Sequence, residues 1–334
     1  MNKILFFFFI VLGFSSCQAP TYEKMYINGL AQGTYYAITY YDYQSRDFQN
    51  DVDSLLAAFD LSVSVYQPNS IVSKVNRNER DVVLDDWFIG NFELSQEISE
   101  ETEGSFDMTI APLANVWGFG TFEKPDSINV ALIDSLKQFV DYRKVALKNG
   151  AVLKENPGIQ LNFNAIAQGY AVDVLADYFV EQGIDNLLID LGGEIIAKGE
   201  KPNGDSWKIG IEIPEENAES RFYNSIVHLK NEAVATSGNY RKFYEIDGVK
   251  YAHSLDPKTG YPVKHSLLST TVIAKTAAIA DAYATAFMVL GVDKSLKLAE
   301  KHPDLKVYLI YDDNGLMKSA MSANFQQYIE PESK

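Results

Sequence analysis

Hydrophobic and polar positions along the chain predict strands and helices in irregular alternation. Small and aromatic residues alternate in NGLAQGTYYAITYYDY, a pattern typical of a β-strand near the start of the chain. Helical patterns cover residues 50–60 and 87–103, and a third helix is predicted in AIAQGYAVDVLADYFVEQG, where Gly183 closes it. Between the second and third helices, ALKNGAVL predicts a hairpin because Asn-Gly separates two short apolar runs.

The second half of the chain is richer in strands. They are predicted in NLLIDLGGEIIAKGE, WKIGIEIP, NSIVHL, KFYEIDGVKYAHSL and LLSTTVIAKT, before a helix over 277–290, a shorter helix near 293–301 and a hairpin around DDNG. Runs of strands with helices interposed irregularly predict an α+β fold, in which helices cover a mostly antiparallel or mixed sheet. No repeat or linker divides the sequence after residue 21, so residues 22–334 are expected to form one domain.

The helix predicted over 277–290 contains an acid among apolar residues. In AAIADAYATAFMVLG, Asp281 and Thr285 stand four residues apart and therefore share a face, and Gly291 is suited to end the helix. An unpaired buried carboxylate would shift its pKa or destabilise the fold, so Asp281 needs a cation, a hydrogen-bond network or access to solvent. A carboxylate and a hydroxyl on one face suit Mg²⁺. The alternative is structural: Asp281 caps a neighbouring loop, and Thr285 bonds back to its own helix.

The first 16 residues have the organisation of a signal peptide. Lys3 lies in a short positive segment, ILFFFFIVLGF is an apolar core too short to span a bilayer, and SSC supplies small residues. Cys17 is the only cysteine, which excludes a disulfide within the chain. Its position resembles a bacterial lipobox, although Phe14 stands where such sequences usually have leucine. We predict lipidation of Cys17 and a tether over 17–21; ordinary cleavage beside an incidental cysteine is the alternative.

The formal net charge of −16 constrains the partners of the chain. So acidic a surface argues against nucleic acid and against electrostatic adhesion to anionic lipid. Removal of Lys3 with the signal peptide makes the charge more negative still. Membrane attachment is therefore expected through the lipid anchor, which predicts a lipoprotein of the bacterial cell envelope facing the periplasm or the exterior.

Several familiar catalytic motifs are absent from the sequence. There is no Walker A sequence, no G-x-G-x-x-G, no G-x-S-x-G, no H-E-x-x-H and no C-x-x-C. With four histidines and one cysteine, a structural zinc site is not expected. The absences leave oxygen ligands as the basis of any metal site.

Three other segments combine turn residues with polar side chains. In GSFDMTIAPLANVWGFG, Asp107 beside Phe106 suits recognition next to an aromatic wall, or else the acid satisfies backbone amides and Trp117 belongs to the core. NFNAIAQGYA leads from a strand into a helix start whose amides favour phosphate, with plain N-capping as the alternative. LIDLGGEI ends a strand at Gly192-Gly193, which permits close approach of a ligand or another backbone, or marks a bulge.

His253 is a candidate base, because a neutral imidazole can take a proton from an attacking hydroxyl. A lone histidine on a strand is more often structural, and DPKTG just after it is simply a turn on local grounds. The residues alone leave both interpretations open.

The order of these segments along one chain resembles the FAD:protein FMN transferase family, the flavin transferases also called ApbE proteins. The matching segments are QGTYYAI, SVYQPNSIVSKVN, GSFDMTIAPLANVWGF, NFNAIAQGYAVD, LIDLGGEI, ATSGNY, HSLDPKTGYPV and STTVIAKTAAIADAYATAFMVLG. The resemblance implies an α+β fold and a Mg²⁺-dependent enzyme. Such an enzyme binds FAD, transfers its FMN half to a threonine hydroxyl of an exported or membrane-bound protein, and releases AMP.

The resemblance also implies roles for individual residues. The implied metal ligands are Asp281, Thr285 and the backbone carbonyl of Ala165, and His253 falls on the family histidine proposed to deprotonate the acceptor. With His253, Asp281 is expected to be essential for catalysis. The implied flavin contacts are Gln32, Tyr66, Ser105, Phe106, Asp107, Asn162, Gln168 and Leu255.

Three positions depart from the usual family pattern. Gln32 replaces a common methionine, Gln168 replaces a common lysine or glutamate, and Ala284 stands where some members have a second aspartate. The last departure leaves Asp281 and Thr285 as the side-chain ligands of this helix. Two other functions stay open: a hydrolase that cleaves FAD to FMN and AMP, and a lipid-anchored flavin-binding protein without turnover.

Overall fold

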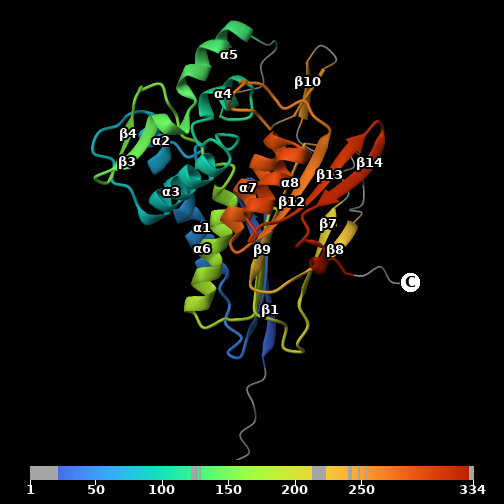
Figure 1. Cartoon of the computed structure of the whole chain (residues 1–334). Helices are drawn as coiled ribbons and strands as arrows, with labels where there is room; N and C mark the ends of the chain where they lie inside the picture. Colours follow the sequence, from blue (N-terminus) through green and yellow to red (C-terminus); the bar gives the residue numbers. More distant parts are fainter. Residues whose placement is uncertain are drawn as a thin grey trace, which may run out of the picture.

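An antiparallel β-sheet runs through the centre of the molecule (Figure 1). The structure is a computed structural model and describes residues 22–121, 127, 129–212, 223–239, 243–246, 249–252 and 254–330. Within these residues the sheet has eight strands, and all neighbouring pairs are antiparallel. In spatial order they are β1 (Glu23–Ala31), β2 (Thr34–Asp42), β5 (Leu187–Leu191), β6 (Glu194–Lys198), β9 (Glu232–Gly238), β12 (Leu267–Ala274), β13 (Lys306–Asp313) and β14 (Leu316–Met321).

Helices and shorter hairpins surround this sheet. The hairpins pair β3 (Val145–Lys148) with β4 (Ala151–Lys154), β7 (Trp207–Glu212) with β8 (Tyr223–Leu229), and β10 (Phe243–Ile246) with β11 (Val249–Ala252). The α-helices are α1 (Gln49–Val63), α2 (Ile71–Asn76), α3 (Asp86–Glu101), α4 (Ala111–Val116), α5 (Val130–Leu136), α6 (Ala167–Glu181), α7 (Ala277–Leu290) and α8 (Val292–Lys301). Single 3₁₀ turns occur at Lys137–Phe139, Tyr142–Lys144 and Gln326–Tyr328.

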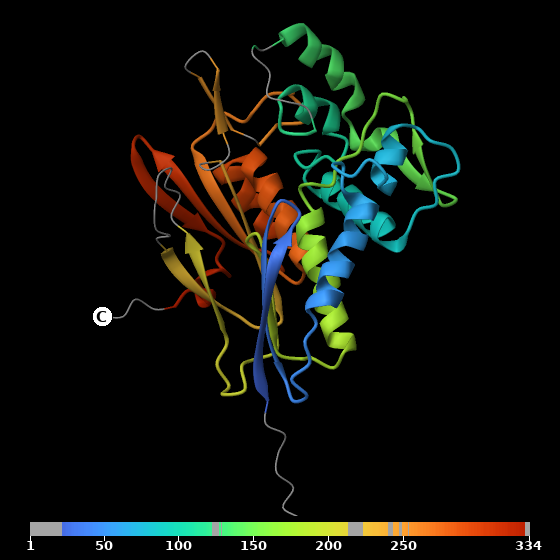
Figure 2. The same cartoon turned by 180° about the vertical axis from the view of Figure 1, so that it is seen from behind.

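The alternation of side chains decides which face of the sheet the helices cover. In β2, Tyr36, Ile38 and Tyr40 are fully buried, whereas the residues between them are partly exposed. The buried set packs with apolar residues of α1, α6 and α7, and these helices lie over the same face in both views (Figures 1 and 2). The predicted α+β fold, with helices covering a mostly antiparallel sheet, is therefore confirmed.

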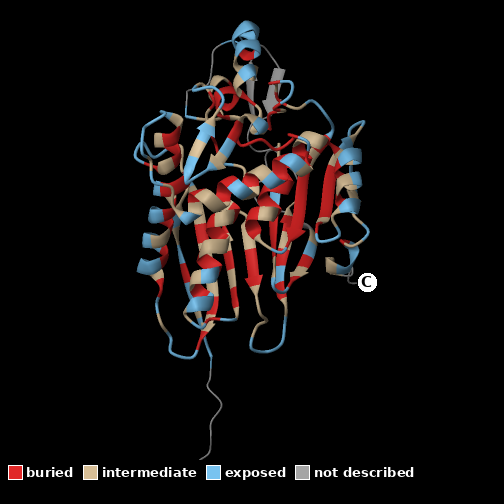
Figure 3. Ribbon diagram, turned by 60° about the vertical axis from the view of Figure 1, so that its left-hand side comes forward, coloured by how far each residue is buried: buried red, intermediate tan, exposed pale blue. Residues whose placement is uncertain are grey.

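The opposite face of the sheet is covered by the β7–β8 hairpin. Trp207 and Val227 of this hairpin pack with Ile273 of β12 and with Phe325 in a second apolar cluster. Because Val272, the neighbour of Ile273, belongs to the helical-face cluster, β12 is buried on both faces (Figure 3). The strand that precedes α7 is thus held rigidly from both sides.

A third apolar cluster joins α4 and α5 to a distant segment of the chain. It contains Leu113, Trp117, Ile133 and Leu255, and the indole Nε1 of Trp117 donates to the carbonyl of Gly260 at 2.8 Å. Trp117 is therefore a core residue, as the structural interpretation of its segment predicts. The cluster brings residues 105–119 and 254–260 to the same end of the sheet.

Most predicted elements have the predicted type, but two expected strands are hairpins. The opening segment folds into β1 and β2, because Gln32 and Gly33 have φ values of 51° and 76° and form a two-residue turn. Gly192 and Gly193, with φ values of 65° and 109°, likewise connect β5 to β6. The pair is a tight turn, so the bulge interpretation is wrong. What approaches Gly192 closely is a side chain, and not another backbone, because a Cβ there would lie 2.2 Å from Nε2 of Gln168.

Helices α6 and α7 meet at Gly169, near the start of both. A Cβ on this glycine would lie 2.3 Å from the carbonyl oxygen of Ala277 and 2.9 Å from the Cα of Ala278. Both atoms are backbone, so they cannot move aside as the end of a flexible side chain can. The distance between the two helices at this point therefore requires glycine.

We expect Gly169→Ala to destabilise the protein, although alanine is by itself the better helix former. Overpacking of this kind costs about 1–3 kcal/mol of unfolding free energy, which is measurable by urea denaturation followed by circular dichroism. Gly90→Ala in α3 is the control, because its Cβ would meet the end of the Tyr170 side chain rather than backbone. A Gly169→Ala variant as stable as wild type would contradict the close contact.

Candidate functional site

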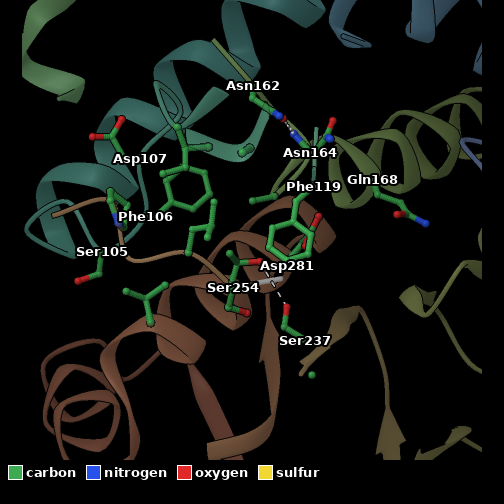
Figure 4. Close-up of a pocket in the computed structure, with 18 of the residues that line it drawn as sticks. Ser105, Phe106, Asp107, Phe119, Asn162, Asn164, Gln168, Ser237, Ser254 and Asp281 are labelled. Carbon is green, nitrogen blue, oxygen red and sulfur yellow. Dashed lines mark hydrogen bonds between the residues drawn. The ribbon is translucent and has the colours of Figure 1, made fainter. Parts of the chain in front are cut away.

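A cavity of about 590 Å³ lies beside the start of α6 and along one face of α7 (Figure 4). This volume is typical of sites for organic ligands. Its walls come from segments far apart in the sequence, which the third apolar cluster and the β5–β6 turn bring together. The residues lining it include Tyr66, Ser105, Phe106, Asp107, Phe119, Asn162, Asn164, Ala165, Gln168, Gly192, Glu194, Thr236, Ser237, Ser254, Leu255, Asp281, Thr285 and Val289.

One face of α7 carries polar groups into this cavity. Asp281, Thr285 and Val289 are spaced four residues apart, and all three line it. The side chain of Asp281 is buried, and its Oδ2 accepts a hydrogen bond from the amide of Gly169 at 3.2 Å. Burial raises the pKa of Asp281 to about 7, and the nearby Asp173 adds to the rise. The carboxylate thus occupies a place where a cation would stabilise its charge.

The start of α7 is held by an acid from the other helix. Asp173 of α6 accepts hydrogen bonds from the amides of Ala277 and Ala278, one on each carboxylate oxygen and each at 2.8 Å. The hydroxyl of Thr276 accepts from the amide of Ile279 and completes the cap. Burial raises the pKa of Asp173 to about 6. The first turn of α7 is therefore fixed to α6.

Hydroxyl groups lie next to Asp281. The Oγ1 of Thr285 is 3.3 Å from the Oγ of Ser237 on β9, and the Oγ1 of Thr236 is 2.9 Å from that of Thr271 on β12. The side chain of Thr285 thus contacts β9 of the sheet, which differs from the alternative in which it bonds back to its own helix. With the nearby backbone of Ala165, these groups make a set of hard oxygen donors, the kind that Mg²⁺ prefers.

The side chains that could coordinate a metal do not form an acidic cluster in the described part of the chain. No three His, Cys, Asp or Glu side chains there are placed to share a metal ion. A cation beside Asp281 would therefore depend on hydroxyl, carbonyl, water and ligand oxygens, as the alanine at position 284 predicts. Such a donor set fits Mg²⁺, which usually keeps several waters and takes oxygens from a phosphate ligand.

The wall of the cavity is acidic. Among the lining residues that the structure describes, Asp107, Glu194 and Asp281 are acids, and none is a lysine, arginine or histidine. Among these described residues, a phosphate-containing ligand would meet no compensating positive side chain. The cavity is therefore suited to an anion that arrives with a metal cation.

Aromatic rings form another part of the wall. Phe106 is almost fully buried, and its ring and that of Phe119 both lie at the cavity, where Figure 4 shows them with Asp281 nearby. Tyr66 is 57% exposed, and its hydroxyl accepts a hydrogen bond from the side chain of Asn164. Flat apolar surfaces with a few polar groups are typical of sites that hold a ring system.

Asp107 lines the cavity, but its carboxylate is engaged within the protein. It accepts hydrogen bonds from the amide and hydroxyl of Thr109 and from the amide of Tyr142, at 2.6–2.9 Å. Burial raises its pKa, and these hydrogen bonds act in the opposite direction. The acid therefore holds the loop that carries Phe106, as the structural interpretation of this segment predicts.

The start of α6 is also largely satisfied within the protein. The amide of Ala167 donates to the carbonyl of Phe163, and that of Gly169 donates to Asp281. Two of the first three amides of α6 are thus engaged, so the structure does not support a phosphate cradle built from this helix start. Asn162 accepts from the amide of Asn164, which shapes the turn before the helix.

The structure brings most of the predicted site residues together. The cavity is lined by Tyr66, Ser105, Phe106, Asp107, Asn162, Ala165, Gln168, Leu255, Asp281 and Thr285. Gln32 lies outside this lining, in the β1–β2 turn, where its side chain donates to Asp60 at 3.1 Å. His253 and Cys17 lie outside the described residues.

Several lining residues were not predicted as site residues. Phe119, Glu194, Thr236 and Ser237 come from the segments WGFG, LGGEI and ATSG, which carry turn signals in the sequence. Their short polar or aromatic side chains have no distinctive spacing. Only the folded arrangement shows that they share a cavity with Asp281.

Comparisons with known proteins give a consistent result. Residues 32–309 match the sequence model described as the ApbE family. The FAD:protein FMN transferase of Haemophilus influenzae is 33% identical to this chain, with 94% of each covered. That of Vibrio cholerae is 30% identical and covers 94% of this chain and 95% of its own length. The solved structure of flavin transferase ApbE from Vibrio cholerae has a TM-score of 0.84 at 30% identity, covering 92% of this chain and 100% of that one.

The raised pKa of Asp281 predicts how stability depends on pH when no divalent cation is present. Between about pH 3.8 and pH 7 the folded chain keeps a proton that the unfolded chain has lost, so the unfolding free energy falls as pH rises. The decrease in unfolding free energy is complete above the pKa of the folded chain, and there is no decrease below the pKa of the unfolded chain.

Asp281→Asn removes this loss while keeping an oxygen for the amide of Gly169. With EDTA present, we expect the variant to have the higher Tm near pH 8 and the same Tm as wild type near pH 4. Each pKa unit corresponds to about 1.4 kcal/mol, so calorimetry resolves the difference. A wild-type Tm at pH 8 equal to that of the variant would show that the buried charge is already compensated.

Proposed function

This chain belongs to the ApbE family and is an enzyme that transfers flavin groups, and from that premise we propose its reaction in detail. FAD binds in the cavity beside α6 and α7, and its FMN half is transferred to a threonine hydroxyl of an acceptor protein. The threonine oxygen forms a bond to the phosphorus of the FMN phosphate. The bond from that phosphorus to the bridging oxygen breaks, and AMP leaves with this oxygen.

The observation that carries the proposal is the acidic wall of a cavity suited to a nucleotide. FAD brings a negatively charged pyrophosphate to a wall that has carboxylates and no basic side chain among its described residues. Bound Mg²⁺ would neutralise charge on the phosphate oxygens, which is the main requirement of phosphoryl transfer. Asp281, Thr285 and the carbonyl of Ala165 would hold it.

The remaining site residues bind the substrate and handle the proton. The aromatic wall of Phe106 and Phe119 suits the flavin ring, and Ser105, Asn162, Gln168 and Leu255 line the same cavity. His253 takes the proton of the acceptor threonine, which makes the hydroxyl oxygen a better nucleophile. The protein forms no covalent intermediate with the flavin in this scheme.

The proposal also includes a location for the enzyme, which is based on the predicted lipidation near its N-terminus. Lipidation at Cys17 anchors the mature chain to a membrane of the bacterial cell envelope, where exported or membrane proteins are the acceptors. Among the residues that the structure describes, no helix is long and apolar enough to cross a bilayer.

Incubation of the mature chain with FAD, Mg²⁺ and an acceptor protein tests the reaction. A gain of one FMN by the acceptor, measured by mass spectrometry, is the expected result. Free FMN and AMP without labelled acceptor would indicate the hydrolase instead, and intact bound FAD would indicate a protein that only binds flavin. Asp281→Ala should lower transfer at least about 100-fold while the protein stays folded.

Asp293→Asn is the matched control, because it removes one exposed acid from the neighbouring helix α8. It should transfer FMN at the wild-type rate. Wild-type activity and Mg²⁺ dependence in Asp281→Ala would contradict the proposed role of Asp281.

Replacement of the proposed base separates its role from that of substrate binding. We expect His253→Ala to slow transfer by about 100-fold or more, since general bases contribute on this scale, while the affinity for FAD stays near wild type. Equilibrium binding of FAD and single-turnover transfer measure the two effects. A loss confined to FAD affinity would place His253 in the binding site and not in proton transfer.

A further inference from the structure

Asp173 has a position in the fold that its sequence segment does not reveal. It lies on α6, outside the lining of the cavity, and its carboxylate is directed to another helix. Each of its carboxylate oxygens accepts a hydrogen bond from one backbone amide in the first turn of α7. The relation is reciprocal, because Asp281 of α7 accepts a hydrogen bond from an amide in the first turn of α6. Each helix therefore supplies an acid that caps the start of the other.

The two caps lie around the point where the helices touch. Gly169 is in contact with the backbone of Ala277, one of the two residues whose amides Asp173 accepts. This close backbone contact, together with the hydrogen bonds that its residues donate to Asp281 and Asp173, opposes both sliding and rotation of α7 against α6. Rotation matters most here, because consecutive residues of a helix are about 100° apart around its axis.

The position of α7 decides whether the proposed metal donors meet. Ala165 precedes α6 by two residues, whereas Asp281 and Thr285 lie on one face of α7. A shift between the helices would therefore separate the carbonyl donor from the two side-chain donors. Residues behind metal ligands commonly have this effect, and their loss weakens metal binding by about 10–100-fold.

We infer that Asp173 is a positioning residue for the divalent-cation site, which it maintains by locking α7 to α6 through the amides of Ala277 and Ala278. The inference rests on the proposed function, since it presumes a cation at Asp281. Asp173 does not itself contact the cation or the substrate. Its removal should affect cation affinity more than a comparable loss of helix capping elsewhere.

Asp173→Asn tests this inference, with Mn²⁺ as the probe and electron paramagnetic resonance of free Mn²⁺ as the measurement. The variant keeps the size of the side chain but can offer only one acceptor oxygen to the two amides. We expect its affinity for Mn²⁺ to fall about 10-fold or more below that of wild type. Differential scanning fluorimetry shows whether the variant is folded.

Two control variants separate positioning from simpler effects. Thr276→Ala removes the cap on Ile279 and destabilises the same turn of α7, but leaves the link to α6 intact. Asp177→Asn removes an exposed acid one turn further along α6. Both controls should bind Mn²⁺ within about 3-fold of wild type. A Thr276→Ala loss as large as that of Asp173→Asn would mean that frayed capping alone explains the effect, and would overturn the inference.

Wild-type affinity in folded Asp173→Asn would also overturn it. If wild type itself fails to bind Mn²⁺, it is the proposed cation site that fails. If Asp173→Asn does not fold, hydrogen exchange in the wild type decides. Cation binding and the α6–α7 lock would stabilise the same arrangement, so the amides of Ala277 and Ala278 should be better protected from exchange in metal-saturated protein than in metal-free protein. Exchange in the presence of Mg²⁺ can be read directly, whereas Mn²⁺ is removed after the exchange and before the reading. Unchanged protection would contradict the inference.

Discussion

The site depends on two helices that begin close together and cap one another with acids, Asp281 being buried and Asp173 partly buried. Asp173 satisfies the first amides of α7, and Asp281 accepts an amide near the start of α6, with Gly169 allowing the two backbones to touch between them. Helix starts attract negative charge because their amides are unpaired. Here that attraction also stabilises two carboxylates at one helix junction, although Asp281 is buried and Asp173 partly buried. Only one of the two, Asp281, faces the cavity.

This arrangement leaves a charge that the described residues do not balance. Among the described residues, Asp281 accepts one hydrogen bond, from the amide of Gly169 at 3.2 Å, and no lysine, arginine or histidine lines the cavity with it. Burial accordingly raises the pKa of Asp281 towards neutrality. A divalent cation would compensate both this carboxylate and the pyrophosphate of FAD. Under the proposed function, the charge that destabilises the metal-free protein would therefore favour a metal–nucleotide complex in the cavity, which is the form in which phosphoryl transfer is catalysed.

The sequence predicts the fold class and many of the elements, because alternation, helical spacing and Asn-Gly turns are local signals. It predicts correctly that Asp281 and Thr285 share a face, and family resemblance adds most of the cavity lining. Local signals fail where function depends on contacts across the chain. The Gln32-Gly33 turn splits an apparent single strand, α4 lies in a segment for which no helix is predicted, and the link from Asp173 to Ala277 spans 104 residues. Asp107 shows the opposite case, since the carboxylate of a residue in a plausible binding motif is hydrogen-bonded to the backbone of Thr109 and Tyr142.

The central claim is that the junction of α6 and α7 holds a divalent cation against the nucleotide. Crystals of the protein soaked with Mn²⁺ and FAD test it most directly, because anomalous scattering locates manganese without assumptions about the fold. The account predicts a peak within bonding distance of a carboxylate oxygen of Asp281, the hydroxyl of Thr285 and the carbonyl of Ala165, with FAD phosphate oxygens completing its coordination. Bound FAD with no manganese peak at Asp281, or manganese coordinated elsewhere in the cavity, would contradict the account.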